Sequence, residues 1–94
     1  MENTIDYIKL VQQAQLGDKE CLNRLAEAVR GRLYSYVYRH TLSDDLTHDI
    51  VQESILKMLE ALKELRKAEL FWPWLYKIAL NKIRHHYRDK QLSR

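Results

Sequence analysis

The chain has 94 residues, of which 46% are hydrophobic, and a formal net charge of +3 at pH 7. This length predicts one domain with a single modest core and leaves no room for a deep enzyme cleft. The single cysteine excludes a disulfide framework, and the absence of an apolar run of about 20 residues or a signal peptide argues against a membrane or exported protein. We therefore expect a cytoplasmic protein. We also expect an all-α domain, a compact bundle of about four helices, because Leu, Lys, Glu, Arg, Gln and Ala are abundant and Gly and Pro are scarce.

The first two predicted helices meet at a tight corner. Asn3 or Thr4 can cap the first helix, and Gly17 suits the left-handed residue that closes it. Asp18 is a good N-cap for the second helix, which we expect to run from about Lys19 to His40. Gly17 and Asp18 therefore predict a tight corner that joins two helices.

The third predicted helix begins after Ser43 and continues to about Leu65. One side is apolar at helical spacing, and the opposite side carries Asp49, Gln52, Glu53, Leu56 and Glu60. Leu56 is unusual among these polar neighbours. Two readings stay open: a scattered exposed leucine, which is common, or the apolar centre of a docking surface with a polar rim.

The fourth predicted helix runs from Phe71 to Arg88, because Pro73 is acceptable only in a first helical turn. More than half of its circumference is apolar or aromatic. The remaining arc carries Lys77, Asn81, Arg84 and Arg88, flanked by Trp74 and His85. Such a stripe is usually a solvated face, but cations interleaved with aromatic rings also fit binding of single-stranded nucleic acid.

Charge is divided unevenly between these last two helices. Residues 44–65 carry a net charge of minus four and residues 66–94 a net charge of plus six. An acidic surface next to a phosphate-binding surface would repel the phosphates. The division therefore predicts two different partners.

Catalytic and metal chemistry have no support in the sequence. His40, His48, His85 and His86 include no pair one helical turn apart, and no glycine-flanked nucleophile or phosphate loop is present. We expect no enzyme, no metal site and no cofactor.

Several motifs together resemble bacterial sigma factors of the sigma-70 family. The segments D-I-V-Q-E-S (49–54) and W-L-Y-K-I-A-L-N (74–81) are similar to signatures of region 2 of the extracytoplasmic-function (ECF) type. The Q-x-G-D corner (15–18) and the R-L-Y-x-Y run (32–36) also fit. The resemblance implies that residues 1–94 form a region 2 domain and that the region 4 domain which reads the minus-thirty-five element is absent. The chain is then either a fragment of a longer sigma factor, which is the favoured reading, or a protein that acts through one promoter element only.

The resemblance also implies two partners. The third helix would dock on the coiled coil of the β′ subunit of core RNA polymerase through Asp49, Gln52, Glu53 and Leu56. The last helix and the preceding loop would capture the non-template strand of the minus-ten promoter element. The DNA-contacting positions would be Lys57, Tyr76, Lys77, Asn81 and His85, to which the stripe adds Arg84 and Arg88.

Within the segment 62–71, the resemblance implies a pocket for a flipped-out base at Leu62, Leu65 and Phe71. An anti-sigma factor is a further candidate partner. The alternative reading is a helical protein-interaction module that binds polymerase or an anti-sigma factor without reading DNA. Affinity for single-stranded DNA separates the two.

Overall fold

The computed structural model describes residues 6–92, and every regular element among them is helical. Four α-helices follow one another as α1 (Tyr7–Gln15), α2 (Lys19–Thr41), α3 (Asp44–Ala61) and α4 (Phe71–Leu92). Two short 3-10 helices, η1 (Leu62–Glu64) and η2 (Ala68–Leu70), join α3 to α4. The predicted all-α bundle of four helices is confirmed.

Some predicted boundaries move. Asp6 caps α1 by accepting a hydrogen bond from the Lys9 amide at 3.1 Å, whereas the predicted caps Asn3 and Thr4 lie outside the described residues. Helix α3 ends at Ala61, four residues before the predicted end, because the chain tightens there into a 3-10 turn. Helix α4 extends beyond Arg88 to Leu92.

The turn between α2 and α3 is held by hydroxyl groups and a left-handed leucine. Leu42 has a φ of 56° and closes α2 through a 2.8 Å hydrogen bond from its amide to the Tyr38 carbonyl. The Thr41 hydroxyl lies 2.6 Å from that of Thr47 and accepts from the Ser43 amide at 3.1 Å. Ser43 caps α3 as predicted. These bonds fix the direction in which α3 leaves the corner.

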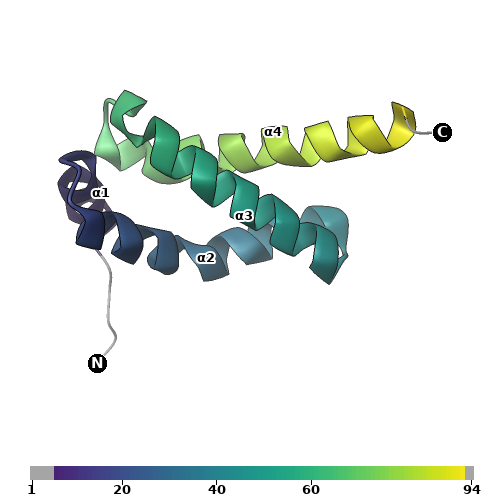
Figure 1. Cartoon of the computed structure of the whole chain (residues 1–94), viewed down its shortest axis with the longest axis horizontal. Helices are drawn as coiled ribbons and strands as arrows, with labels where there is room; N and C mark the ends of the chain where they lie inside the picture. Colours follow the sequence, from purple (N-terminus) through teal and green to yellow (C-terminus); the bar gives the residue numbers. More distant parts are fainter. Residues whose placement is uncertain (1–5, 93–94) are drawn as a thin grey trace.

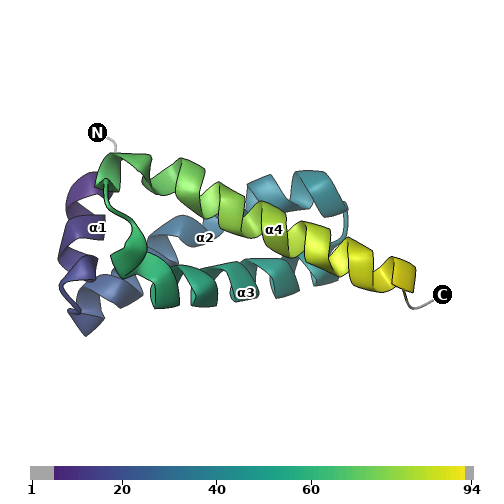
Figure 2. The same ribbon diagram turned by 90° about the horizontal axis from the view of Figure 1, so that it is seen from above.

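Helices α3 and α4 form an antiparallel hairpin closed by the segment 62–70, and α2 crosses beneath them (Figures 1 and 2). Helix α1 packs across the end of the bundle where this hairpin closes. The core runs along the bundle and takes one apolar side from each helix. Its fully buried large side chains include Leu25, Leu33, Ile50, Met58, Leu62, Phe71 and Leu75.

Tyr34 on α2 donates a hydrogen bond to the carboxylate of Asp44 at the start of α3. Only the neutral phenol can donate this bond, so the bond, together with partial desolvation and the nearby negative charge, raises the pKa of Tyr34 to about 12. A folded-state pKa above the ordinary tyrosine value near 10 means that the contribution to stability is complete below pH 10. That contribution is lost as the pH rises through 12.

We therefore expect Tyr34 to ionise above the ordinary pKa of tyrosine in an alkaline titration of the folded protein. Asp44→Asn removes the charge and should return the pKa of Tyr34 toward 10, because an amide favours the neutral phenol less. Tyrosine carbon shifts followed by NMR would measure this. Tyr36→Phe, at a tyrosine of the same helix whose ring stacks on Tyr76, is the control. An unchanged Tyr34 titration in Asp44→Asn would contradict the assignment.

Candidate nucleic-acid interface

Helix α4 buries one side and exposes the opposite side. Leu75, Ala79 and Ile83 are at most 3% exposed and recur at spacings of four, which defines the core side. The predicted stripe of Lys77, Asn81, Arg84 and Arg88 is exposed along its length. The stripe is thus a free cationic surface on a rigid helix.

A groove between α3 and α4 brings together three predicted DNA-contacting residues from two helices. Lys57 of α3 and Asn81 and His85 of α4 line it, and its volume is about 300 Å³. Ile78 and Lys82 complete the lining. The groove therefore offers an apolar floor, an amide and cations next to the exposed stripe.

Tyr76 lies on the other flank of α4, toward α2. Its hydroxyl accepts a 2.7 Å hydrogen bond from Nε of Arg32, and its ring stacks on Tyr36 at a centroid distance of 4.4 Å. The Arg32 guanidinium lies 4.1 Å from the centroid of the Trp72 ring. The predicted DNA-contacting set is therefore split by α4 into a groove side and an aromatic side.

The connecting segment, residues 62–70 between α3 and α4, is held in place by side chains that point into the core. Leu62, Leu65, Ala68 and Phe71 recur every three residues and are at most 8% exposed, because 3-10 turns bring every third side chain to the same side. The prediction that Leu62, Leu65 and Phe71 line a pocket open to a base is not supported in this conformation, because all three belong to the core. The residues that reach solvent here are Lys63, Glu64, Arg66, Lys67, Glu69 and Leu70.

Gln15 ties this segment to α1. Its side-chain amide nitrogen donates to the carbonyls of Leu62 and Leu65 at 2.9 and 2.8 Å. This explains the first residue of the Q-x-G-D corner, whose glycine has a φ of +90°. Gln15 thus sets the position of the loop between α3 and α4.

The outer face of α3 is a separate surface. Leu56 is 58% exposed, and with Gln52 it lines a groove of about 250 Å³ against α2. Asn23, Glu27 and Arg30 form the α2 side of that groove. Asp49 is exposed on the same helix but lines a different hollow near the α2–α3 corner.

Glu53 differs from the other predicted polymerase-contacting residues. It leans toward α4, where its carboxylate lies 3.1 Å from Nε2 of His86. Both side chains are partly exposed, at 41% and 28% respectively. Glu53 therefore links the α3 face to α4 and is only in part available to an external partner.

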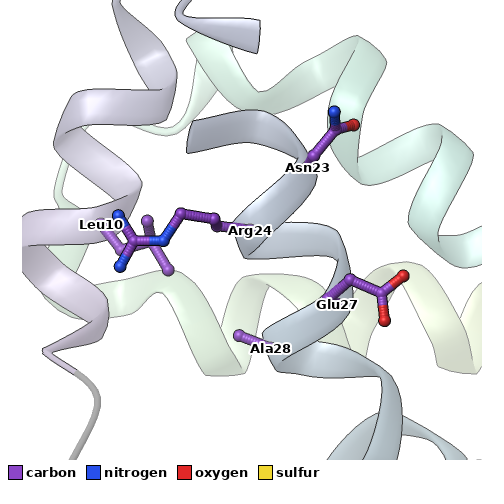
Figure 3. A pocket seen from close by; sticks show the side chains of 5 residues that line it. All are labelled: Leu10, Asn23, Arg24, Glu27 and Ala28. Carbon is purple, nitrogen blue, oxygen red and sulfur yellow. The ribbon is translucent and has the colours of Figure 1, made fainter. Parts of the chain in front are cut away.

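A hollow of about 430 Å³ between α1 and α2 contains none of the predicted site residues. Figure 3 shows Arg24 extending from α2 toward Leu10 of α1, while Asn23 and Glu27 point away from α1. Among the residues that the structure describes, no group of His, Cys, Asp and Glu could hold a metal ion. Within the same residues, no helix is long and apolar enough to cross a membrane.

The sequence alone did not single out Gln15, Tyr36, Ile78, Lys82 or His86 as site residues. Their roles depend on contacts between positions far apart in the chain, such as the pair Gln15 and Leu65, which are separated by 50 residues. The only available signal was that Gln15 and Tyr36 fall inside matched motifs. Periodicity within one helix carries no information on such contacts.

The fold and the two surfaces define a helical domain with a cationic, aromatic face and a separate acidic face. The family model of Sigma-70 region 2 matches residues 25–93. The chain therefore belongs to the sigma-70 region 2 family.

Curated relatives and a solved structure agree with this assignment. The chain is 36% identical over 77 residues to the ECF RNA polymerase sigma-E factor of Salmonella typhimurium, and 35% identical to that of Escherichia coli K12. Each alignment covers 82% of this chain but 40% of the relative, so the chain spans about two fifths of those proteins. The fold matches an engineered region 2 of sigmaE, solved by NMR in complex with GTAAAA, with a TM-score of 0.82 and 30% identity over 97% of this chain and 95% of that chain.

Gln15→Leu tests the anchoring of the connecting segment. The substitution keeps the size of the side chain but removes both donors. We expect a loss of about 1–3 kcal/mol in the free energy of unfolding, because the Leu65 carbonyl loses its partner and the Leu62 carbonyl keeps only its bond from the Leu65 amide. Urea unfolding would measure the change, and the Leu65 amide should exchange faster with solvent. Gln12→Leu, at an exposed position of α1, is the control. Equal stability of the two variants would rule out the anchor.

Proposed function

We propose that this chain is the region 2 domain of an ECF-type sigma factor, a non-enzymatic transcription initiation domain. In this proposal it binds core RNA polymerase and captures the non-template strand of the minus-ten promoter element. The observation that carries the proposal is the groove in which Lys57, Asn81 and His85 converge from two helices beside the exposed stripe. Family membership and the nucleic-acid complex of the neighbouring structure support it.

The DNA face has the components that strand capture needs. Unstacking a base costs a few kcal/mol, which stacking, amide hydrogen bonds and phosphate neutralisation can offset. Asn81 supplies an amide, Lys57 and Lys82 supply cations, and Ile78 supplies an apolar floor. Arg84 and Arg88 extend the charge along α4. In this proposal the segment 62–71 takes the flipped-out base along its exposed side.

The acidic face is suited to a protein partner. Leu56 is a large apolar side chain, 58% exposed, with Gln52 and Glu60 one helical turn away in either direction and Asp49 two turns away on the same side of α3. An apolar centre inside a polar rim is the usual anatomy of a protein interface. We assign this face to the β′ coiled coil of core polymerase, with an anti-sigma factor as a second candidate partner. The corresponding location of the protein is the cytoplasm.

Asn81→Ala tests the groove. We expect about tenfold weaker binding of the single-stranded oligonucleotide GTAAAA, because a base-edge hydrogen-bonding partner is worth about 1–3 kcal/mol. Lys57→Ala should also weaken binding. The slope of the logarithm of the binding constant against the logarithm of salt concentration, here called the salt slope, should become shallower by about 0.7, the value for one phosphate on a single strand. Fluorescence anisotropy at several salt concentrations would measure both.

The matched control for Asn81→Ala is Asn23→Ala, at an exposed position of α2 that lines other hollows. If the two asparagine variants bind equally well, the groove is not the nucleic-acid site. If the wild type has no affinity for the oligonucleotide, the alternative gains support: a helical module that binds polymerase or an anti-sigma factor without reading DNA. The exposed Leu56 is the observation that favours that alternative.

Leu56→Ala tests the polymerase face. We expect at least about thirtyfold weaker binding to core polymerase, because residues at the centre of an interface cost about 2 kcal/mol or more when truncated. Gln52→Lys should act in the same direction. Leu16→Ala and Gln12→Lys make the same chemical changes at exposed positions of the α1 end. Competition binding to core polymerase would give the affinities, and equal losses in variants and controls would overturn the assignment.

A further inference from the structure

A cation of α2, Arg32, lies against the aromatic side of α4 and has no role in the strand capture proposed above. Arg32 of α2 donates through Nε to the Tyr76 hydroxyl at 2.7 Å, and its guanidinium carbon lies 4.1 Å from the Trp72 ring centroid. The same carbon lies 5.7 Å from the centroid of Tyr76. These contacts fix both the plane and the direction of the guanidinium.

The rings beneath Arg32 form a continuous support. Tyr76 stacks on Tyr36 at 4.4 Å, Trp72 contacts Tyr76 at 5.5 Å, and Tyr7 meets the Trp72 ring edge to face at 5.1 Å. The indole nitrogen of Trp72 is buried and has no hydrogen-bond partner among the described residues. The ring is therefore held by packing, and Arg32 is one of the groups that pack on it.

The charge of Arg32 is not neutralised within the domain. Arg32 is exposed, and between residues 6 and 92 no carboxylate forms an ion pair with it. Its Nε is occupied by Tyr76, which leaves the terminal amino groups for an external acceptor. Two other arginines of α2 are placed differently: Arg30 lies 3.9 Å from Glu27, and Arg24 reaches toward α1 (Figure 3).

We propose that Arg32 is a preorganised phosphate-binding residue that extends the nucleic-acid face from α4 onto α2. A planar guanidinium with free terminal amino groups matches the geometry of a phosphate. Arg84, eight residues after Tyr76 on α4, lies about 12 Å along the helix axis and about 80° around it, at the edge of the exposed stripe nearest Tyr76. The ligand is a phosphodiester of the strand that α4 binds, so the inference rests on the proposed function.

Because Arg39 follows Arg32 by seven residues, it lies on the same side of α2, and it is exposed. A nucleic-acid strand that continues from Arg32 along α2 would contact Arg39 next. Arg24 has the same charge but reaches toward α1 (Figure 3). The chain thus provides its own matched control.

The test compares Arg32→Gln with Arg24→Gln in binding the GTAAAA oligonucleotide extended by four thymidines at each end. Loss of one phosphate contact on a single strand lowers the salt slope by about 0.7, which at 0.1 M salt is about fivefold in affinity. We expect this change in Arg32→Gln and none in Arg24→Gln. Arg32→Lys keeps the charge and should keep the slope while losing part of the affinity, because lysine cannot form the stacked fork.

A second measurement locates the phosphate. Replacing each phosphate in turn by a neutral methylphosphonate should reveal one position that weakens wild-type binding but has no further effect in Arg32→Gln. Thermal unfolding followed by circular dichroism shows whether the variant is folded. Lower affinity with an unchanged salt slope, and with no such position, would mean that Arg32 only holds Trp72 in place and would overturn the proposal.

The phosphate site and the proposed function can fail separately. If the wild type binds and Asn81→Ala weakens binding while Arg32→Gln leaves affinity and slope unchanged, the phosphate site is wrong and the proposed function stands. If the wild type does not bind the oligonucleotide at any salt concentration, both are overturned.

Discussion

The structure depends on the burial of one side of α4 between α2 and α3. Leu75, Ala79 and Ile83 are almost completely inaccessible to solvent, and burying each such leucine or isoleucine contributes about 1.5–3 kcal/mol. Because a helix is rigid, fixing this side fixes every other side chain of α4 in direction. The exposed stripe, the groove toward α3 and the aromatic flank toward α2 all follow from that one packing arrangement.

The connecting segment is controlled by the same core. Its four inward residues repeat every three positions, so the path from α3 to α4 is set by apolar burial together with the Gln15 amide. The consequence for function is that the apolar residues of this segment support the fold. Any recognition by the segment falls to its charged, outward residues, which carry both signs between Lys63 and Glu69.

The acidic face of α3 and the cationic face of α4 are joined by a direct contact. Glu53 on α3 and His86 on α4 form a contact between them, one residue from His85 in the groove. A partner that draws Glu53 away would release a restraint on α4 next to the candidate DNA site. The domain is therefore built so that its two proposed surfaces share a structural element, which separate domains on a flexible linker would not do.

The sequence determined the fold class, the number of helices and the sides of α3 and α4 that face solvent. Those features follow from periodicity, caps and composition, which are local properties. Through its family resemblance it also suggested Lys57, Asn81 and His85 as candidate DNA-contacting residues, and all three line the groove between α3 and α4. The tertiary structure alone decided that Leu65 and Phe71 are core residues, that Glu53 turns to His86, and that Arg32 rests on Trp72. Each of these depends on which residues of other helices lie opposite, and that is set by how the helices cross and not by the spacing within any one of them.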